Sequence, residues 1–239
     1  MVKDITDNIE EQILRNKLKD IQRIFHEGET YTMWEYVGLC TMGIKIYSFY
    51  YQYRRNQVIL QINPQTVLGM DGKSTLFEVD YETLEQCFFS VEKKLKEYQV
   101  KIDDFTISRI DFTRDIQFEK KGVVDSIINL LRKTGAPYKY HMTKYGGREY
   151  ENSYDITDGG DSIVVYNKEK QYAEMEGEEK AEVMKGVMRI EVRTAVEESI
   201  YQNGKLDYSK VITSEEYAEQ IIRNVFIEGF YIKLKKMKS

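Results

Sequence analysis

The segment that decides the fold is Phe105–Phe118, which reads FTISRIDFTRDIQF. Its apolar side chains alternate with charged or hydroxyl side chains, a pattern typical of a strand that buries one face and leaves the other open. The apolar side carries Ile110, Phe112, Ile116 and Phe118, and the polar side carries Arg109, Asp111, Thr113 and Asp115. A sheet that contains this strand is therefore expected to carry fixed charges on its open face.

Two later segments show related patterns. Val187–Thr194 reads VMRIEVRT, and its polar side carries Arg189, Glu191 and Arg193. Ser162–Lys168 reads SIVVYNK, places Tyr166 and Lys168 on one side, and follows the turn sequence DGGD, so it is expected to be the second arm of a hairpin. If the three strands are neighbours, their polar sides converge.

The rest of the chain supplies helices and a second hairpin. Helical spacing predicts helices over residues 1–28, Tyr81–Tyr98, Gly122–Lys133 and Ser214–Leu234. Strands are predicted over Gly43–Tyr53, Gln57–Ile62 and Tyr138–Tyr145. This order predicts an α+β fold with a central, mainly antiparallel sheet and helices packed on one face. We expect one domain over 1–239, with an N-terminal helical extension (1–39), a sheet core (40–200) and a C-terminal helix with a basic tail (201–239).

Charge and cysteine content limit the class of protein. The chain has 239 residues and a formal net charge of −5, which argues mildly against nucleic acid because sequence-indifferent DNA binders are mostly basic. Lys and Arg nevertheless gather at 54–55, 139–148 and 233–238, so a local basic channel fits the sequence. Cys40 and Cys87 lack paired spacing, the segment MVKDITDNIEEQ lacks the basic and apolar regions expected of a signal peptide, and no run approaches the length of a membrane helix. We expect a cytoplasmic protein with no membrane partner.

The converging charges suit a site for a divalent metal and a phosphate. Carboxylates such as Asp111 and Glu191 are oxygen ligands of the kind Mg²⁺ takes, and phosphate and water complete its shell. Arginines match phosphate bidentately, and a cation such as Lys168 beside Tyr166 favours the ionised phenol. The alternative is that these charges only pair across the sheet, without any chemistry.

Four segments in order resemble the rolling-circle replication initiators of plasmids, integrative elements and filamentous phages. They are INPQTVLG from Ile62, SRIDFTRDI from Ser108, VVYNKEKQ from Val164 and MRIEVRT from Met188, and the resemblance covers about residues 40–200. It implies a sheet nicking domain and a metal-dependent endonuclease and strand transferase, in which a tyrosine attacks a DNA phosphodiester and becomes linked to the 5′-phosphate.

The resemblance also implies roles for particular residues. Asp111 and Glu191 would hold Mg²⁺ or Mn²⁺, with Asp115 as a further candidate ligand. Arg109, Arg189 and Arg193 would bind phosphate or support the site, and Lys168 would assist electrostatically. The nucleophile is expected to be Tyr166, with Tyr154 and Tyr150 as alternatives, and a buried structural tyrosine is the competing interpretation of Tyr166.

The sequence departs from one branch of such enzymes. Its histidines are His26 and His141, so it lacks the histidine-hydrophobe-histidine pair, and only the carboxylate-metal form of the enzyme fits. His141 is a further possible ligand, although a lone strand histidine is more often an ordinary hydrogen-bonded residue. The tyrosine-rich strand at Tyr47, Phe49, Tyr51 and Tyr53 suits base stacking, but core packing is its more frequent explanation.

The leading hypothesis is a replication initiator that nicks and rejoins one DNA strand at a rolling-circle origin. Its expected partners are single-stranded or cruciform origin DNA, a host helicase, and a second copy of the chain in a homodimer. One alternative is a noncatalytic relative that binds single-stranded or origin DNA. Another is a metal-dependent nuclease in which water replaces the tyrosine.

Overall fold

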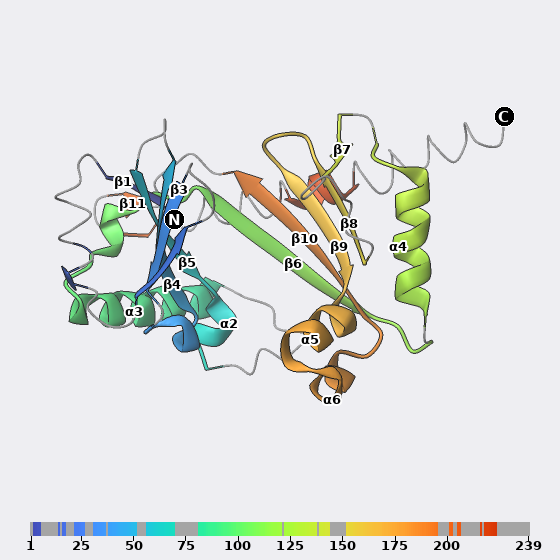
Figure 1. Cartoon of the computed structure of the whole chain (residues 1–239), viewed down its shortest axis with the longest axis horizontal. Coiled ribbons are helices and arrows are strands. Elements are labelled where there is room, and N and C mark those ends of the chain that lie inside the picture. The colour runs from blue at the N-terminus through green and yellow to red at the C-terminus, as the bar shows by residue number, and fades with distance from the viewer. Residues whose placement is uncertain are drawn as a thin grey trace. The chain divides into compact units, whose positions relative to one another are not determined.

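The structure is a computed structural model, and it describes part of the chain. The described residues are 2–5, 14, 16–17, 22–26, 31–36, 38–51, 56–69, 81–120, 122–137, 139–143, 152–195, 201–202, 205–206, 216 and 218–223. The chain divides into two compact units, each with its own five-stranded sheet (Figure 1). The first unit is Met1–Ser108 with Glu197–Tyr208, and the second is Arg109–Val196 with Ser209–Ser239. We expected one domain, whereas the contacts divide the chain into two units, and the strands of the first unit pair among themselves.

The sheet of the first unit is antiparallel, in the order β1-β5-β4-β3-β2. Its strands are β1 (Val2–Ile5), β2 (Gln22–His26), β3 (Tyr31–Tyr36), β4 (Ile44–Tyr51) and β5 (Asn56–Ile62). The predicted hairpin of β4 and β5 is confirmed. The predicted helix over residues 1–28 is wrong at β1 and β2, since pairing at the two edges of this sheet overrides the helical spacing. Within that range, the described residues 14, 16 and 17 are helical.

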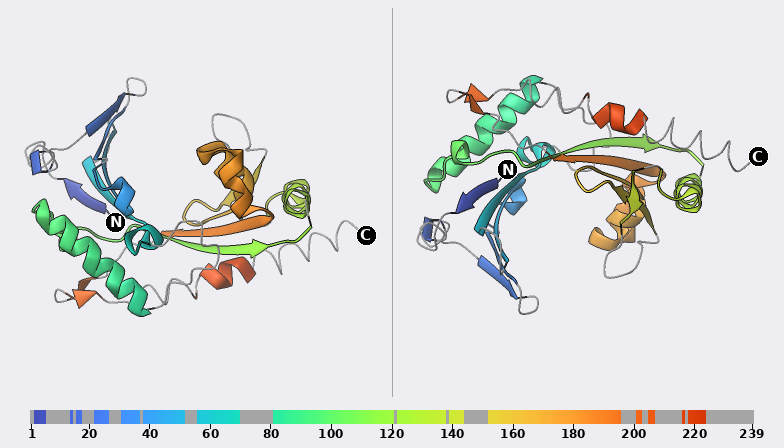
Figure 2. Two further views of the ribbon diagram at one scale, coloured as in Figure 1. Left: turned by 90° about the horizontal axis from the view of Figure 1, so that it is seen from below. Right: turned by 90° about the horizontal axis from the view of Figure 1, so that it is seen from above.

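One face of this sheet is buried. Ile44 pairs with Ile62 and Ile46 pairs with Leu60, and three of these four side chains are at most 2% exposed. Helix α3 (Tyr81–Glu97) runs along one side of the sheet (Figure 2), and it buries Cys87, Val91 and Leu95. The short helix α2 (Pro64–Val67) follows β5 directly. The helix predicted over Tyr81–Tyr98 is thus confirmed.

The tyrosine-rich strand is described in part. Tyr47 follows the buried Ile46 in β4, so it lies on the opposite face, where it is half-buried. The side chains of Phe49 and Tyr51, and the whole of Tyr53, lie outside the described residues. The short strands β11 (Tyr201–Gln202) and β12 (Lys205–Leu206) pair with each other.

The sheet of the second unit is also antiparallel, in the order β6-β10-β9-β8-β7. Its strands are β6 (Arg109–Gln117), β7 (His141–Met142), β8 (Ser153–Thr157), β9 (Ser162–Asn167) and β10 (Val187–Ala195). The three strands with charged polar sides are therefore adjacent, with β10 in the middle, which meets the condition for their polar sides to converge. The hairpin of β8 and β9 is present as predicted, with Asp158–Asp161 as its turn.

The apolar face of this second sheet holds the core of the unit. Helix α4 (Val123–Thr134) contributes Val124, Ile128 and Leu131 to a cluster with the strands. The other members of the cluster are Tyr154, Ile156, Ile163, Val165, Met188, Val192, Ala218 and Ile221. Ala218 and Ile221 belong to a short helical stretch, and most of the helix predicted over Ser214–Leu234 lies outside the described residues. The α+β class is confirmed.

The segment that follows β9 forms two helices. Helix α5 (Lys168–Glu176) begins where β9 ends, and α6 (Glu178–Ala181) follows it after Gly177. No helix in the part of the chain that the structure describes has both the length and the apolar character needed to cross a membrane.

Candidate functional site

The register of the second sheet decides which side chains share its polar face. Residues directly opposite each other in an antiparallel pair lie on the same face. On β6 and β10, Asp111 is opposite Arg193, and Asp115 is opposite Arg189. Arg189 is in turn opposite Tyr166 of β9. The register thus gathers charges from positions more than 70 residues apart in the sequence on one face of the sheet.

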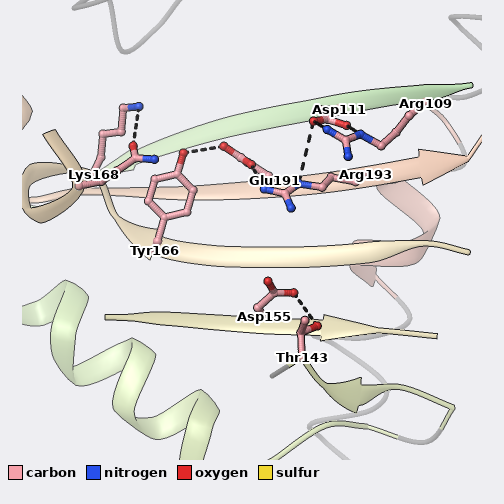
Figure 3. A network of polar contacts seen from close by, with 9 residues as sticks. Arg109, Asp111, Thr143, Asp155, Tyr166, Lys168, Glu191 and Arg193 are labelled. Atoms are coloured by element: carbon pink, nitrogen blue, oxygen red, sulfur yellow. Dashed lines mark hydrogen bonds and ion pairs between the residues drawn. The ribbon is translucent and has the colours of Figure 1, made fainter. Parts of the chain in front are cut away.

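A chain of polar contacts runs across this face (Figure 3). The Tyr166 hydroxyl donates a hydrogen bond to Oε1 of Glu191 at 2.5 Å. Arg193 donates to the other oxygen, Oε2 of Glu191, at 3.0 Å. The Nε atom of Arg193 also lies 4.0 Å from Oδ2 of Asp111. Arg109 in turn pairs with Asp111. Its Nε atom lies 2.7 Å from Oδ1 of Asp111, and its Nη2 atom donates to Oδ2 of Asp111 at 2.9 Å. Tyrosine, carboxylates and arginines thus form one connected network.

A second ion pair lies on the same face. Arg189 donates from Nε to Oδ1 of Asp115 and from Nη2 to Oδ2, both at 2.6 Å. The two side chains are 14% and 5% exposed. Both oxygens of Asp115 therefore accept hydrogen bonds from Arg189, and its low exposure makes Asp115 less accessible than Asp111 and Glu191 to the metal ion that it was predicted to bind. Burial alone would lower the pKa of Arg189, but the hydrogen bonds and charge of Asp115 raise it overall.

The electrostatic environment of Tyr166 differs from the expected one. Burial, together with the charge and hydrogen bond of Glu191, raises the pKa of Tyr166, and the opposing effect of Arg189 is smaller. Lys168 was expected to favour the ionised phenol, but the phenol is held in its neutral form. The Lys168 ammonium lies 5.8 Å from the centre of the Tyr166 ring and donates to Gln171 at 3.0 Å. Burial, followed by the charge of Arg189, lowers the pKa of Lys168.

The alternative nucleophiles are placed elsewhere. Tyr154 is fully buried on the apolar face, and its hydroxyl donates to the carbonyl oxygen of Gly135 at 3.3 Å. Burial raises its pKa. Because Tyr154 lies on the opposite face from Glu191, the interpretation of Tyr154 as a nucleophile of this site is not supported. Tyr150 lies outside the described residues. His141 is an exposed residue of the edge strand β7.

Two further pairs of hydrogen-bonded side chains were not predicted from the sequence. Asp155 on β8 accepts a hydrogen bond from Thr143 at 2.9 Å, and its charge contributes to the raised pKa of Arg193. The alternation Ser153, Tyr154, Asp155, Ile156, Thr157 would have placed Asp155 on the polar face. Asn167 caps α5 by accepting from the Lys170 amide, and it donates to Asp125 of α4 at 3.0 Å. This cap fixes the start of the helix that carries Lys168.

The carboxylates have the chemistry of a magnesium or manganese site. Asp111 and Glu191 present carboxylate oxygens of the kind that these ions bind, and their side chains are 33% and 15% exposed. Two carboxylates suffice for Mg²⁺ when substrate phosphate and water supply the other ligands. Among the described residues, no three His, Cys, Asp or Glu side chains form a group that holds a metal ion by itself.

Comparison of the chain with models of known protein families finds no match. Comparison with curated proteins finds none either.

Proposed function

We propose that the polar face of the second sheet is a DNA strand-transfer site, in which Tyr166 attacks a phosphodiester. The observation that carries the proposal is the hydrogen bond from the Tyr166 hydroxyl to one carboxylate oxygen of Glu191. Arg193 donates a hydrogen bond to the other oxygen of the same carboxylate. A nucleophile, a base within hydrogen-bond distance, and a third group that orients the base form the arrangement expected of nucleophilic catalysis. The neutral phenol needs such a base, because burial and Glu191 raise its pKa.

The proposed reaction balances as a transesterification. Glu191 takes the proton from the Tyr166 hydroxyl while the phenolic oxygen attacks the phosphorus atom. The bond from phosphorus to the 3′-oxygen breaks, and that oxygen takes the proton from Glu191 to become a 3′-hydroxyl. The 5′-phosphate stays on Tyr166, so the reverse reaction rejoins the strand. The stored phosphotyrosyl bond distinguishes this enzyme from a hydrolytic nuclease.

The cations of the face have a proposed role in binding the phosphate. Arg109 is 56% exposed and Arg193 is 29% exposed, so both are more accessible than Arg189. Guanidinium groups bind phosphate oxygens bidentately and stabilise the charge that develops during transfer. Asp111 and Oε2 of Glu191 would hold Mg²⁺ or Mn²⁺, which when bound polarises the phosphoryl group, and Oε1 of Glu191 would remain for the Tyr166 proton. The net charge of −5 implies that this local cluster, not the whole chain, attracts DNA.

The test uses a pool of random single-stranded oligonucleotides labelled at the 3′ end. With Mn²⁺, the full chain should form a labelled adduct that survives denaturation. The Tyr166→Phe variant should form none, whereas Tyr154→Phe, which changes a buried tyrosine of the other face, should keep it. Circular dichroism establishes that both variants fold. An adduct that persists in Tyr166→Phe, or the absence of any adduct with the unaltered chain, would reject the assignment.

A second candidate is a noncatalytic DNA-binding protein. It is favoured by the low exposure of Tyr166, 8%, and by the engagement of Asp111 and Asp115 with arginines. Salt-sensitive binding of oligonucleotides that is indifferent to metal, with no adduct, would support this candidate. Cleavage that leaves free 5′-phosphates and persists in the tyrosine variants would instead indicate a nuclease that uses water.

A further inference from the structure

Arg193 occupies the position between the two carboxylates of the site. Its Nη2 atom donates to Glu191 Oε2 at 3.0 Å, and its Nε atom lies 4.0 Å from Asp111 Oδ2. In Figure 3 its guanidinium lies between these two side chains. Arg193 is thus a cation that the two carboxylates share, whereas Arg109 pairs with Asp111 at 2.7 Å and makes no hydrogen bond or ion pair with Glu191 among the described residues.

The contacts of Arg193 are incomplete. Among the described residues, its buried Nε atom has no hydrogen-bond partner. The separation of 4.0 Å from Asp111 is an ion pair but is too long for a hydrogen bond. A buried donor without a partner is costly, so this position is a poor resting place for the Nε–H group. Arg189 differs, because both its Nε and its Nη2 donate to Asp115.

A phosphate offers Arg193 what the carboxylates do not. Guanidinium groups bind phosphate through two parallel hydrogen bonds, one of which can come from Nε. Movement of Arg193 toward a phosphate would satisfy the Nε–H group and would leave Glu191 Oε2 and Asp111 Oδ2 without their shared cation. The two carboxylates would then attract a divalent ion.

We infer that Arg193 is a positioning residue that competes with the divalent ion for Asp111 and Glu191. In the DNA-free protein it holds the carboxylates and keeps metal affinity low. It releases them when a DNA phosphate binds its guanidinium, and the divalent ion would then take its place in orienting Glu191. Metal and DNA then bind cooperatively, because each favours the same position of Arg193. This inference rests on the proposed function for its DNA partner, but the competition between Arg193 and the ion is testable without DNA.

The first experiment measures binding of Mn²⁺ alone to the full chain, from the electron paramagnetic resonance signal of the free ion. Arg193→Gln should bind Mn²⁺ about tenfold more tightly, because it removes a positive charge beside the bound cation. A neighbouring charge typically changes a binding equilibrium by about one pKa unit, which is a factor of ten. The matched control is Arg114→Gln. Arg114 is an exposed residue of β6, but it is opposite Ile190 and so lies on the face of the sheet that does not carry the site. Its Mn²⁺ affinity should stay that of the unaltered chain.

A double variant connects the effect to the carboxylates. Adding Asp111→Asn to Arg193→Gln should abolish the gain in Mn²⁺ affinity. If Arg193→Gln does not fold, Arg193→Met, which keeps the aliphatic part of the side chain, replaces it. Equal or weaker Mn²⁺ binding by a folded Arg193 variant would overturn the inference, even if the DNA adduct forms. Tighter Mn²⁺ binding without any adduct would support the competition and reject the proposed function instead.

Discussion

Arg189 and Asp115 join β10 to β6 through two parallel hydrogen bonds of 2.6 Å each. The register places the two residues directly opposite each other, and both side chains are mostly buried. Replacing such a pair by apolar residues is often neutral, but removing one partner leaves an uncompensated buried charge. We therefore expect the pair to contribute more to the register of β6 and β10 than to net stability.

We predict that Asp115→Asn lowers the free energy of unfolding by about 3 kcal/mol, because it leaves the Arg189 charge buried without its partner. Urea unfolding followed by circular dichroism measures the change. The matched control is Glu176→Gln, which breaks the exposed pair of Glu176 with Lys180 and should leave the midpoint unchanged. A cost for Asp115→Asn no larger than that of the control would show that the pair is dispensable.

Part of this arrangement is predictable from the sequence. The alternation in Phe105–Phe118 and in Val187–Thr194 assigns the predicted site residues of each strand to one side of it, and the structure agrees, although Arg114 lies on the other side. Alternation within a strand does not determine which strands pair. The placement of β10 between β6 and β9 depends on contacts between distant segments, such as Asp115 with Arg189. The sequence therefore indicates only that the polar sides converge if these strands are neighbours.

Other features depend on tertiary context that periodicity does not contain. The spacing of Ile9, Ile13 and Leu14 indicated a helix, but edge pairing made β1 and β2 strands on either side of that segment. The environment of Tyr166 was also misjudged. Sequence proximity to Lys168 suggested a lowered pKa, whereas burial and the hydrogen bond to Glu191 raise it. Both the burial and the contact appear only when strands pair.

Gly186, just before β10, lies at a position where the backbone conformation and a close neighbour favour glycine over other residues. Its φ is +69°, and a Cβ atom added there would lie 2.2 Å from the carbonyl oxygen of Phe118. Gly186→Ala should destabilise the protein by about 2 kcal/mol more than Gly122→Ala, because overpacking adds to the backbone strain. Gly122 has a similar φ of +81° with no atom within 4 Å of an added Cβ.

Thermal or urea unfolding of the two glycine variants measures this difference directly. The comparison cancels the cost of a positive φ, which both positions share, and leaves the contact with Phe118. Equal destabilisation by the two substitutions would mean that the backbone around Phe118 moves aside without cost. The Phe118 amide donates to the Gly186 carbonyl at 2.9 Å, so such a movement would also disturb that hydrogen bond.

Glu191→Gln tests the proposed base. Glutamine retains an oxygen that can accept the hydrogen bond from Tyr166, but it does not take a proton at neutral pH. The rate of adduct formation in a single turnover should fall by about 10²- to 10⁴-fold, the usual contribution of general acid–base catalysis. Glu174→Gln, at an exposed position on α5, is the control and should keep the rate of the unaltered chain. A Glu191→Gln rate equal to that of the control would exclude Glu191 as the base.

The last prediction concerns Cys87, which is fully buried in α3. Burial raises the pKa of its thiol from 9.0 to about 11. Between these two pH values the unfolded chain has lost the thiol proton while the folded chain retains it. Since the folded state then binds more protons, the free energy of unfolding falls as the pH rises through this range.

The expected loss from this one group is about 2 kcal/mol between pH 9 and pH 11, at 1.36 kcal/mol for each pKa unit. Other groups titrate in the same range, so the measurement is the difference between the unaltered chain and Cys87→Ala at each pH. The two stability curves should keep a constant separation below pH 9, and above it the curve of the unaltered chain should fall more steeply. Curves that stay parallel up to pH 11 would mean that the folded protein lets the Cys87 thiol ionise as freely as the unfolded chain does.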